Sequence, residues 1–185
     1  MKRKITTNEI INAAIFILDQ QGLEKVTLKN IATELNIKSP SLYNHIKSLD
    51  DILLQTARRS LENLYNNLVK SIIGLEKEKA LLALSDTYRA FFKSHPGQYS
   101  LTQKVALWNK NNFSVSKSDE ILQLVERILV GYNIKDENAI HFIRVWRSYM
   151  HGFLLLETNE SFGLDTDIDE SFTYGLKLLI GSLKE

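Results

Sequence analysis

The chain has no cysteine and only two prolines among its 185 residues. Without cysteine, disulfide bonds, thiolate metal sites and thiol redox sensing are excluded. The scarcity of proline leaves most of the sequence free to form uninterrupted helices. No apolar run approaches the roughly 20 residues of a membrane span, and the opening Met-Lys-Arg-Lys leads into an amphipathic pattern rather than a signal peptide. We therefore expect a cytoplasmic protein that does not enter a membrane.

The motifs that usually mark an enzyme or a metal site are also missing. The sequence has no phosphate-cradling glycine-rich loop, no H-E-x-x-H zinc motif, no Ser-His-Asp set and no paired carboxylates in an apolar setting. His141 and His151 would be separated by about three helical turns, so a shared metal ion is not expected. We expect no enzymatic activity, no cofactor and no metal.

Apolar residues recur with the period of a helix throughout the chain. They make up 44% of the sequence, and no segment sustains the two-residue alternation of a strand. The pattern predicts an all-α fold of about nine helices. The predicted helices span residues 7–21, 28–35, 40–47, 49–73, 76–94, 99–108, 119–131, 136–158 and 168–183, with a surface loop at 109–118 ending in a Ser118 cap and another at 159–166.

Residues 27–47 have the pattern of two short helices joined by a tight turn. Thr27 is a good N-cap for the first helix, and Asn36 tolerates the left-handed conformation that a sharp turn needs. Ser39 is expected to cap the second helix, with Pro40 at its first position, where the missing N–H costs nothing. Such a unit can place its second helix in the major groove of DNA.

The charge distribution agrees with an anionic partner for this part of the chain. Residues 1–60 hold nine Lys and Arg against six Asp and Glu, a net charge of +3. The rest of the chain holds the remaining 14 of 23 basic and 16 of 22 acidic residues, a net charge of −2. The net charge of the whole chain is only +1, so the surplus is local to the N-terminal third.

The stretch from Ile10 to Leu54 resembles the DNA-binding domain of the TetR family of bacterial transcriptional regulators. Two positions depart from the family pattern: Asn36 replaces the usual turn glycine, and Leu49 stands where a phosphate-contacting lysine is common. The resemblance implies a DNA-binding domain at residues 1–48 and a helical effector-binding and dimerisation domain at 49–185, with the helix at 49–73 as connector. The resemblance rests on Ala13-Ala14, Gly22, Thr27, Ile31-Ala32, Leu35 and Ser41-Leu42-Tyr43-Asn44-His45-Ile46-Lys47.

The residue types in the second short helix suit different parts of a DNA groove. Asn44 can pair bidentately with adenine, and Ser41 can bond to any base. Tyr43 and Lys47 are better suited to phosphates, while Leu42 and Ile46 face the core. The predicted DNA-binding residues are Thr27, Lys29, Lys38, Ser39, Pro40, Ser41, Tyr43, Asn44, His45 and Lys47.

The second half resembles the C-terminal domain of a TetR subgroup marked by a Trp followed by His-Gly, here Trp146, His151 and Gly152. The resemblance implies an effector pocket between its helices, whose aromatic walls suit a hydrophobic or aromatic small molecule. Aromatic stripes at helical spacing also form ordinary core, and that alternative stays open. The predicted lining residues are Tyr88, Phe91, Phe92, Tyr99, Trp108, Phe142, Trp146, Tyr149 and Met150.

The same resemblance implies that the last two helices pack with their mates from a second subunit into a four-helix bundle. A two-fold dimer doubles the DNA contacts and reads a palindrome. The predicted interface residues are Leu155, Phe172, Leu176, Leu179, Ile180 and Leu183, with intramolecular core as the alternative.

Together these features predict a ligand-responsive, dimeric repressor that binds a palindromic operator on double-stranded DNA. Effector binding would shift the population between arrangements of the connector helix and so change the separation of the two recognition segments. Two other functions remain open. One is a DNA-binding organiser without an effector, and the other is an enzyme or small-molecule carrier with a vestigial DNA module.

Overall fold

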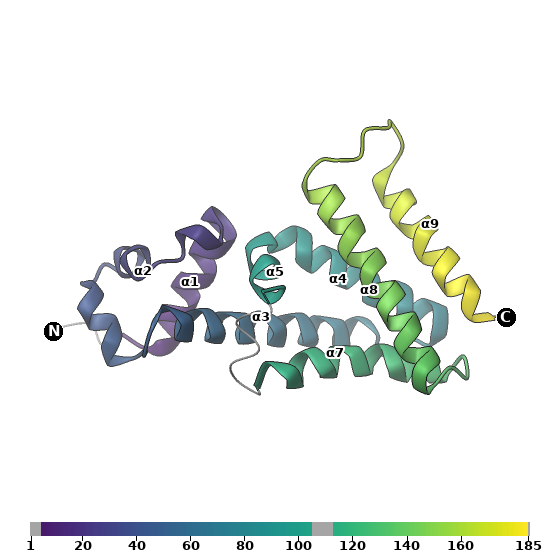
Figure 1. Cartoon of the computed structure of the whole chain (residues 1–185), viewed down its shortest axis with the longest axis horizontal. Coiled ribbons are helices and arrows are strands. Elements are labelled where there is room, and N and C mark those ends of the chain that lie inside the picture. The colour runs from purple at the N-terminus through teal and green to yellow at the C-terminus, as the bar shows by residue number, and fades with distance from the viewer. Residues whose placement is uncertain (1–4, 105–112, 185) are drawn as a thin grey trace. The chain divides into compact units, whose positions relative to one another are not determined.

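The computed structural model describes residues 5–104 and 113–184. Within those ranges all regular secondary structure is helical and no strand occurs (Figure 1), which confirms the predicted all-α class. Within the same ranges no helix is both long and apolar enough to span a bilayer. The helices are α1 (Thr7–Gln21), α2 (Leu28–Glu34), α3 (Leu49–Ser71), α4 (Lys77–Ser94), α5 (Pro96–Thr102), α7 (Phe113–Val130), α8 (Asp136–Thr158) and α9 (Ile168–Gly181), with 3₁₀ turns η1 (Leu23–Lys25), η2 (Ser39–Asn44) and η3 (Ser182–Lys184).

The chain divides into two compact units. The N-terminal unit comprises Met1–Asn63 and Ser94–Lys117, and the C-terminal unit comprises Leu64–Lys93 and Ser118–Glu185. This division differs from the predicted boundary after residue 48, because the first part of α3 and all of α5 pack with the N-terminal helices. The reason is visible in the core, where Ala57 of α3 and Leu101 of α5 are completely buried.

Local sequence signals explain how the N-terminal unit begins. The side chain of Thr6 accepts a hydrogen bond from the backbone of Glu9, whose carboxylate accepts one from the Thr6 backbone, so α1 starts with a capping box. Gly22 ends the helix with a φ of 83°, a conformation that favours glycine. Between these ends Ile10, Ala13, Ala14, Ile17 and Leu18 are buried in the core that α1 shares with α2, α3 and α5.

The C-terminal unit is built from longer helices. Its members are the end of α3 together with α4, α7, α8 and α9, and their buried stripes include Leu81, Leu129, Trp146 and Phe172. The observed bounds of α8 agree with the predicted span 136–158. Each stripe needs a neighbouring helix to cover it, so packing rather than local capping holds this unit together.

Two segments differ from their sequence predictions. The helix expected at 99–108 is α5, which begins at Pro96 because proline suits the first helical turn, and it ends at Thr102. Residues 105–112, with the predicted pocket residue Trp108, lie outside the described ranges. Residues 113–118 were predicted as loop but belong to α7, so Ser118 is not its cap. Polar residues cost a helix only up to about 0.7 kcal/mol each, and the segment has no proline or glycine to break it.

Candidate nucleic-acid interface and partner surfaces

The recognition segment is the six-residue 3₁₀ helix η2 rather than an α-helix. Its backbone bonds run three residues back, as in Ser41 N–H to Lys38 O at 2.9 Å and His45 N–H to Leu42 O at 2.9 Å. Lys38 occupies the N-cap position without a side-chain capping bond, so the predicted Ser39 cap is wrong by one residue. Short 3₁₀ runs of this kind tighten a chain where an α-helix would need more length.

The turn before η2 has the predicted conformation. Asn36 has a φ of 53°, which is the left-handed region. The turn is closed by Ile37 N–H donating to Ala32 O at 2.9 Å. At the start of α2 the Thr27 oxygen accepts from Asn30 N–H at 3.1 Å, as expected of an N-cap. A hydroxyl that accepts one bond still has a hydrogen to donate, so this cap is compatible with the predicted phosphate contact of Thr27, which stays a prediction.

The two faces of η2 have opposite character, as predicted. Leu42 is completely buried and Ile46 is 5% exposed, so both anchor the segment in the N-terminal core. Tyr43 is 57% exposed, and Ser41 and Asn44 are exposed beside it. The division into anchors and outward polar groups is confirmed, while the DNA contacts themselves stay predictions. Of the other predicted contacts, Pro40 is exposed and Ser39 and His45 are half-buried.

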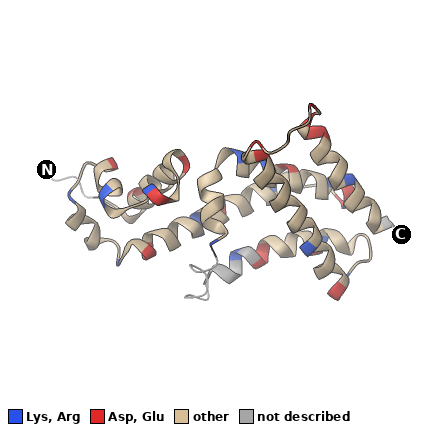
Figure 2. Cartoon of the chain, turned by 45° about the horizontal axis from the view of Figure 1, so that its top comes forward, with Lys and Arg blue, Asp and Glu red and all other residues tan. Residues whose placement is uncertain are grey.

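Lysines flank η2, and the nearby Asp51 carboxylate is bonded to the backbone at the start of α3. Lys29, Lys38 and Lys47 are all exposed, and Figure 2 marks the basic positions of this unit in blue. The Asp51 carboxylate accepts from Lys47 N–H at 2.9 Å, while the Asp51 N–H donates to Ser48 Oγ at 3.1 Å, so Ser48 and Asp51 together cap the start of α3.

Leu49, the position where a lysine is common in the resembled family, has a structural role here. Its half-buried side chain packs against the N-terminal core. The chain therefore exchanges one basic side chain for apolar contact at the start of α3.

The predicted interface residues on α9 and η3 are mostly buried within one chain. Phe172, Leu176, Ile180 and Leu183 are each less than 9% exposed, which favours the alternative of intramolecular core, and the interface itself stays a prediction. Helical spacing marks the stronger apolar stripe, and that stripe faces the chain's own core. Of the remaining two predicted residues, Leu155 is 52% exposed and Leu179 is half-buried.

A second apolar face covers α8 and α9, which lie side by side in the C-terminal unit (Figure 1). Single apolar residues on a surface are ordinary, but six exposed ones on two adjacent helices make this face a candidate partner surface. Gly152 of α8 has open space beside it. The exposed residues are Ile140, Val145, Leu155 and Leu156 on α8 and Tyr174 and Leu178 on α9.

The predicted pocket residues in the C-terminal unit form a close-packed aromatic cluster. The ring of Tyr88 lies 5.1 Å from that of Phe92 and 5.8 Å from that of Trp146. The buried Trp146 indole donates to Ser85 Oγ at 2.8 Å. Burial is expected both of core and of the wall of a closed cavity, so lining stays a prediction. Phe91, Phe142 and Met150 are also buried, Tyr149 is half-buried, and Tyr99 is half-buried in the N-terminal unit.

Two hollows in the C-terminal unit lie away from that cluster. One, of about 550 Å³, is formed by the end of α3 and by α7, and its walls include Val69, Ile72 and Leu124. The other, of about 830 Å³, lies where residues 76–79 meet Tyr132. Neither includes any of the nine predicted pocket residues.

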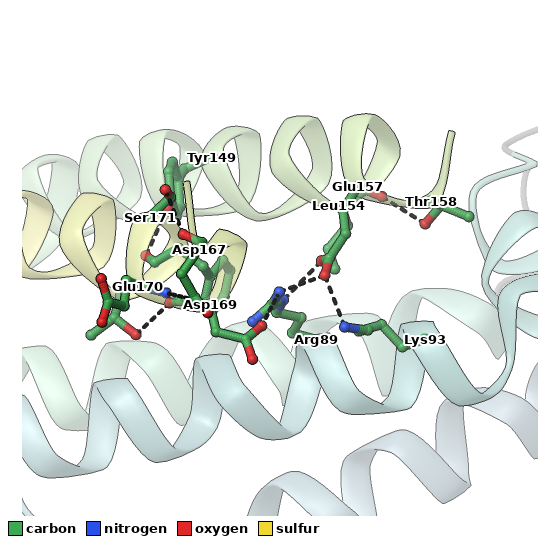
Figure 3. Close-up of polar contacts among 12 residues, drawn as sticks. Arg89, Lys93, Tyr149, Leu154, Glu157, Thr158, Asp167, Asp169, Glu170 and Ser171 are labelled. Carbon is green, nitrogen blue, oxygen red and sulfur yellow. Dashed lines mark hydrogen bonds and ion pairs between the residues drawn. The ribbon is translucent and has the colours of Figure 1, made fainter. Parts of the chain in front are cut away.

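Sequence reasoning missed a buried ion cluster that joins three helices (Figure 3). Arg89 of α4 is 8% exposed, donates from Nε to Glu157 Oε2 of α8 at 2.8 Å, and pairs with Asp169 of α9 at 2.7 Å. Lys93 Nζ lies 2.9 Å from Glu157 Oε1. The guanidinium also stacks 4.5 Å from the ring centre of Phe172. Arg89 and Glu157 are 68 residues apart, so no local pattern could have paired them.

The cluster determines the protonation of its members. Burial would raise the pKa of Glu157, but hydrogen bonds from Arg89 and Lys93 outweigh it and the net pKa is lowered. Burial also raises the pKa of Tyr149 to about 12. The Tyr149 hydroxyl donates to Phe172 O at 2.7 Å, and a side chain at Gly175 would collide with that ring. The hydrogen bond and the close approach of Gly175 to the Tyr149 ring hold α9 against α8.

The sequence matches two family models that together cover most of the chain. Residues 10–56 match the family model described as bacterial regulatory proteins, tetR family, and residues 81–179 match the tetracyclin repressor-like C-terminal domain. The chain is 33% identical over 181 residues to the uncharacterized HTH-type transcriptional regulator YobS of Bacillus subtilis, covering 97% of this chain and 93% of the relative. It is 25% identical to the class E tetracycline repressor protein of Escherichia coli, covering 96% and 90% of the two chains. The crystal structure of BioQ with its natural double-stranded DNA operator has the same fold, with a TM-score of 0.71, 20% identity and coverage of 98% and 99%.

Proposed function

The chain belongs to the TetR family of bacterial transcriptional regulators, and from that premise we propose that it is a ligand-responsive repressor that binds a palindromic operator as a homodimer. Its relatives are regulators and not enzymes, which agrees with the lack of catalytic motifs in the sequence. The class E tetracycline repressor protein and BioQ, named above, are repressor and operator-binding relatives that make repression the favoured mode.

The observation that carries the proposal is the two-faced η2 segment. Leu42 and Ile46 fix it in the core, so the outward side chains are held in a defined orientation. Asn44 would then read an adenine, while Tyr43 and Lys47 would contact phosphates on either side. This anchoring matters because a side chain such as Asn44 must be correctly oriented to make two hydrogen bonds to one base at the same time.

The apolar face of α8 and α9 supports a two-fold dimer. Leu155 and Leu178 are each more than half exposed, and burying them against the same residues of a second copy would remove that apolar area from water. Two copies would present two η2 segments to a palindrome. Binding of one segment to its half-site raises the effective concentration of the other segment at the second half-site. Loss of contact at one half-site therefore removes this gain in affinity and is enough to release DNA.

An effector would act on the aromatic cluster of the C-terminal unit. A hydrophobic or aromatic small molecule fits the side chains of Tyr88, Phe92 and Trp146. Their close packing is also the observation that favours the second candidate, a DNA-binding organiser without effector. The two are distinguished by whether any apolar small molecule releases the protein from its operator.

The test is binding of the full-length protein to DNA from upstream of its own gene, measured by fluorescence anisotropy at several salt concentrations. Tyr43→Ala should weaken binding to all DNA and reduce the salt dependence, because a phosphate contact is lost. Asn44→Ala should weaken mainly the preferred site, by about 1–3 kcal/mol. Asn12→Ala, at an exposed asparagine of α1, is the matched control. Absence of any sequence-specific binding by the wild type would refute the proposal.

A further inference from the structure

α5 depends on α1 for a contact that it cannot make by itself. It has seven residues, and isolated helices shorter than about 12 residues are marginal in water. His95 at its N-cap position makes no side-chain capping bond. Instead Asp19, on α1, accepts from the backbone N–H of Gln98 through Oδ1 at 3.2 Å. One helix of the N-terminal unit is thus capped by a side chain of another.

The same carboxylate binds two more groups of this segment. Gln98 Nε2 donates to Asp19 Oδ2 at 2.6 Å, and His95 Nδ1 lies 3.1 Å from that oxygen. Gln98 as a whole residue is 3% exposed, and the side chain of Asp19 is 13% exposed. Hydrogen bonds to an ionised acceptor in such a setting are about twice as strong as neutral ones.

α5 and α1 approach each other closely at Gly97 and Leu18. A methyl group at Gly97 would collide with the backbone carbonyl of Leu18, so only glycine allows this approach. Leu101 is completely buried in the same core as Leu18. Gln98 Oε1 is buried and finds no hydrogen-bond partner among the described residues, which makes the docked state less favourable than its other contacts imply.

We propose that Asp19 is a positioning residue for DNA binding: by capping α5 it holds α5 on α1, and the docked state is the one that binds operator. α1 also packs on α2 and η1, so its placement bears on the segment that carries the DNA contacts. Only His95 separates the last residue of α4 from the first of α5, so a shift in the end of α4 has a direct route to this joint. The inference rests on the proposed operator binding.

The test uses the full-length protein, its operator fragment, hydrogen exchange and anisotropy. Asp19→Ala should speed exchange of the α5 amides and weaken operator binding by about 5- to 150-fold, the usual range of coupling between sites. The slope of affinity against salt should be unchanged, because no phosphate contact is lost. Asp19→Asn keeps an acceptor for the Gln98 N–H and should recover most of the affinity. Gln20→Ala, the exposed neighbour, should behave as wild type.

By reciprocity, adding operator to the wild type should slow exchange in α5. If Asp19→Ala speeds the exchange of the α5 amides but leaves operator affinity undiminished, the inference fails while the proposed function stands. If exchange of the α5 amides is unchanged, Asp19 does not hold α5 on α1. A wild type without specific DNA binding would instead refute the proposed function. If Asp19→Ala loses its helical circular dichroism, Gln98→Ala serves as the second variant, because it removes the bond from Nε2 to Asp19 and keeps the backbone cap. It should speed α5 exchange and weaken operator binding by less than Asp19→Ala, and faster exchange with undiminished affinity would again overturn the inference.

Discussion

The two units bury charged groups for opposite purposes. In the N-terminal unit the Asp19 carboxylate caps α5, a helix of only seven residues. In the C-terminal unit Arg89 joins longer helices, such as α8 with 23 residues, whose apolar stripes are covered by neighbouring helices. The comparison teaches that a short helix needs a side chain from another helix to complete its first turn, whereas ion pairs between long helices fix which arrangement their packing takes.

The largest effect should come from the C-terminal cluster. Arg89→Ala leaves Glu157 buried without its main partner and should lower the free energy of unfolding by about 3–5 kcal/mol. Arg147→Ala, at an exposed position of α8, should have little effect. Urea denaturation measures both. Equal stability of the two variants would mean that the long helices hold their arrangement without the ion cluster.

The N-terminal unit should be sensitive at its anchors and insensitive on its outer face. Leu42→Ala removes a completely buried side chain and should cost about 2–5 kcal/mol of stability. Tyr43→Ala, next along η2, should change stability by less than about 0.5 kcal/mol. Thermal unfolding distinguishes them, and a comparable loss for Tyr43→Ala would show that the exposed face also supports the fold.

A substitution on the proposed dimer face of α8 and α9 should change self-association without loss of the fold. Leu178→Glu would place a charge in the proposed interface and should weaken self-association by at least about tenfold, or 1.4 kcal/mol. Leu164→Glu is the matched control, because Leu164 is 86% exposed on the loop before α9. Sedimentation velocity reports the association state. If Leu178→Glu leaves self-association unchanged, the face of α9 that carries Leu178 is not part of the interface.

The smallest effect should be at Tyr149. Tyr149→Phe loses the hydrogen bond to Phe172 O and should cost about 0.5–1.5 kcal/mol. The folded pKa of about 12 is above the ordinary value of 10, so the unfolded chain ionises first and this residue's contribution is lost as pH rises from 10 towards 12. The difference in stability between wild type and variant should therefore shrink over that window in chemical denaturation. A constant difference would contradict the raised pKa.

Sequence reasoning succeeded where the cause is local. The left-handed turn at Asn36, the Thr27 cap and the inward pair Leu42 and Ile46 follow from neighbouring residues, and all are present. It failed where the outcome depends on distant partners. The contact between Arg89 and Glu157 joins residues far apart in sequence, and nothing near either one specifies the other.

The predicted interface shows a different limit. The apolar residues of α9 form two stripes, and helical spacing identifies both without saying which one the chain covers itself. Phe172 and Leu176 fill the stripe that meets α8 and α4, which leaves Leu178 outside. The cap of η2 moved by one residue because a 3₁₀ turn closes over fewer residues than an α-helix.

The bond between Trp146 and Ser85 has an optical consequence. The chain contains two tryptophans, and the one at position 146 is 2% exposed and fixed by its indole N–H. Replacing Trp108 with phenylalanine would leave this buried indole as the only tryptophan emitter. Its emission wavelength and quenching by iodide would then report directly whether the aromatic cluster admits water, a ligand or neither.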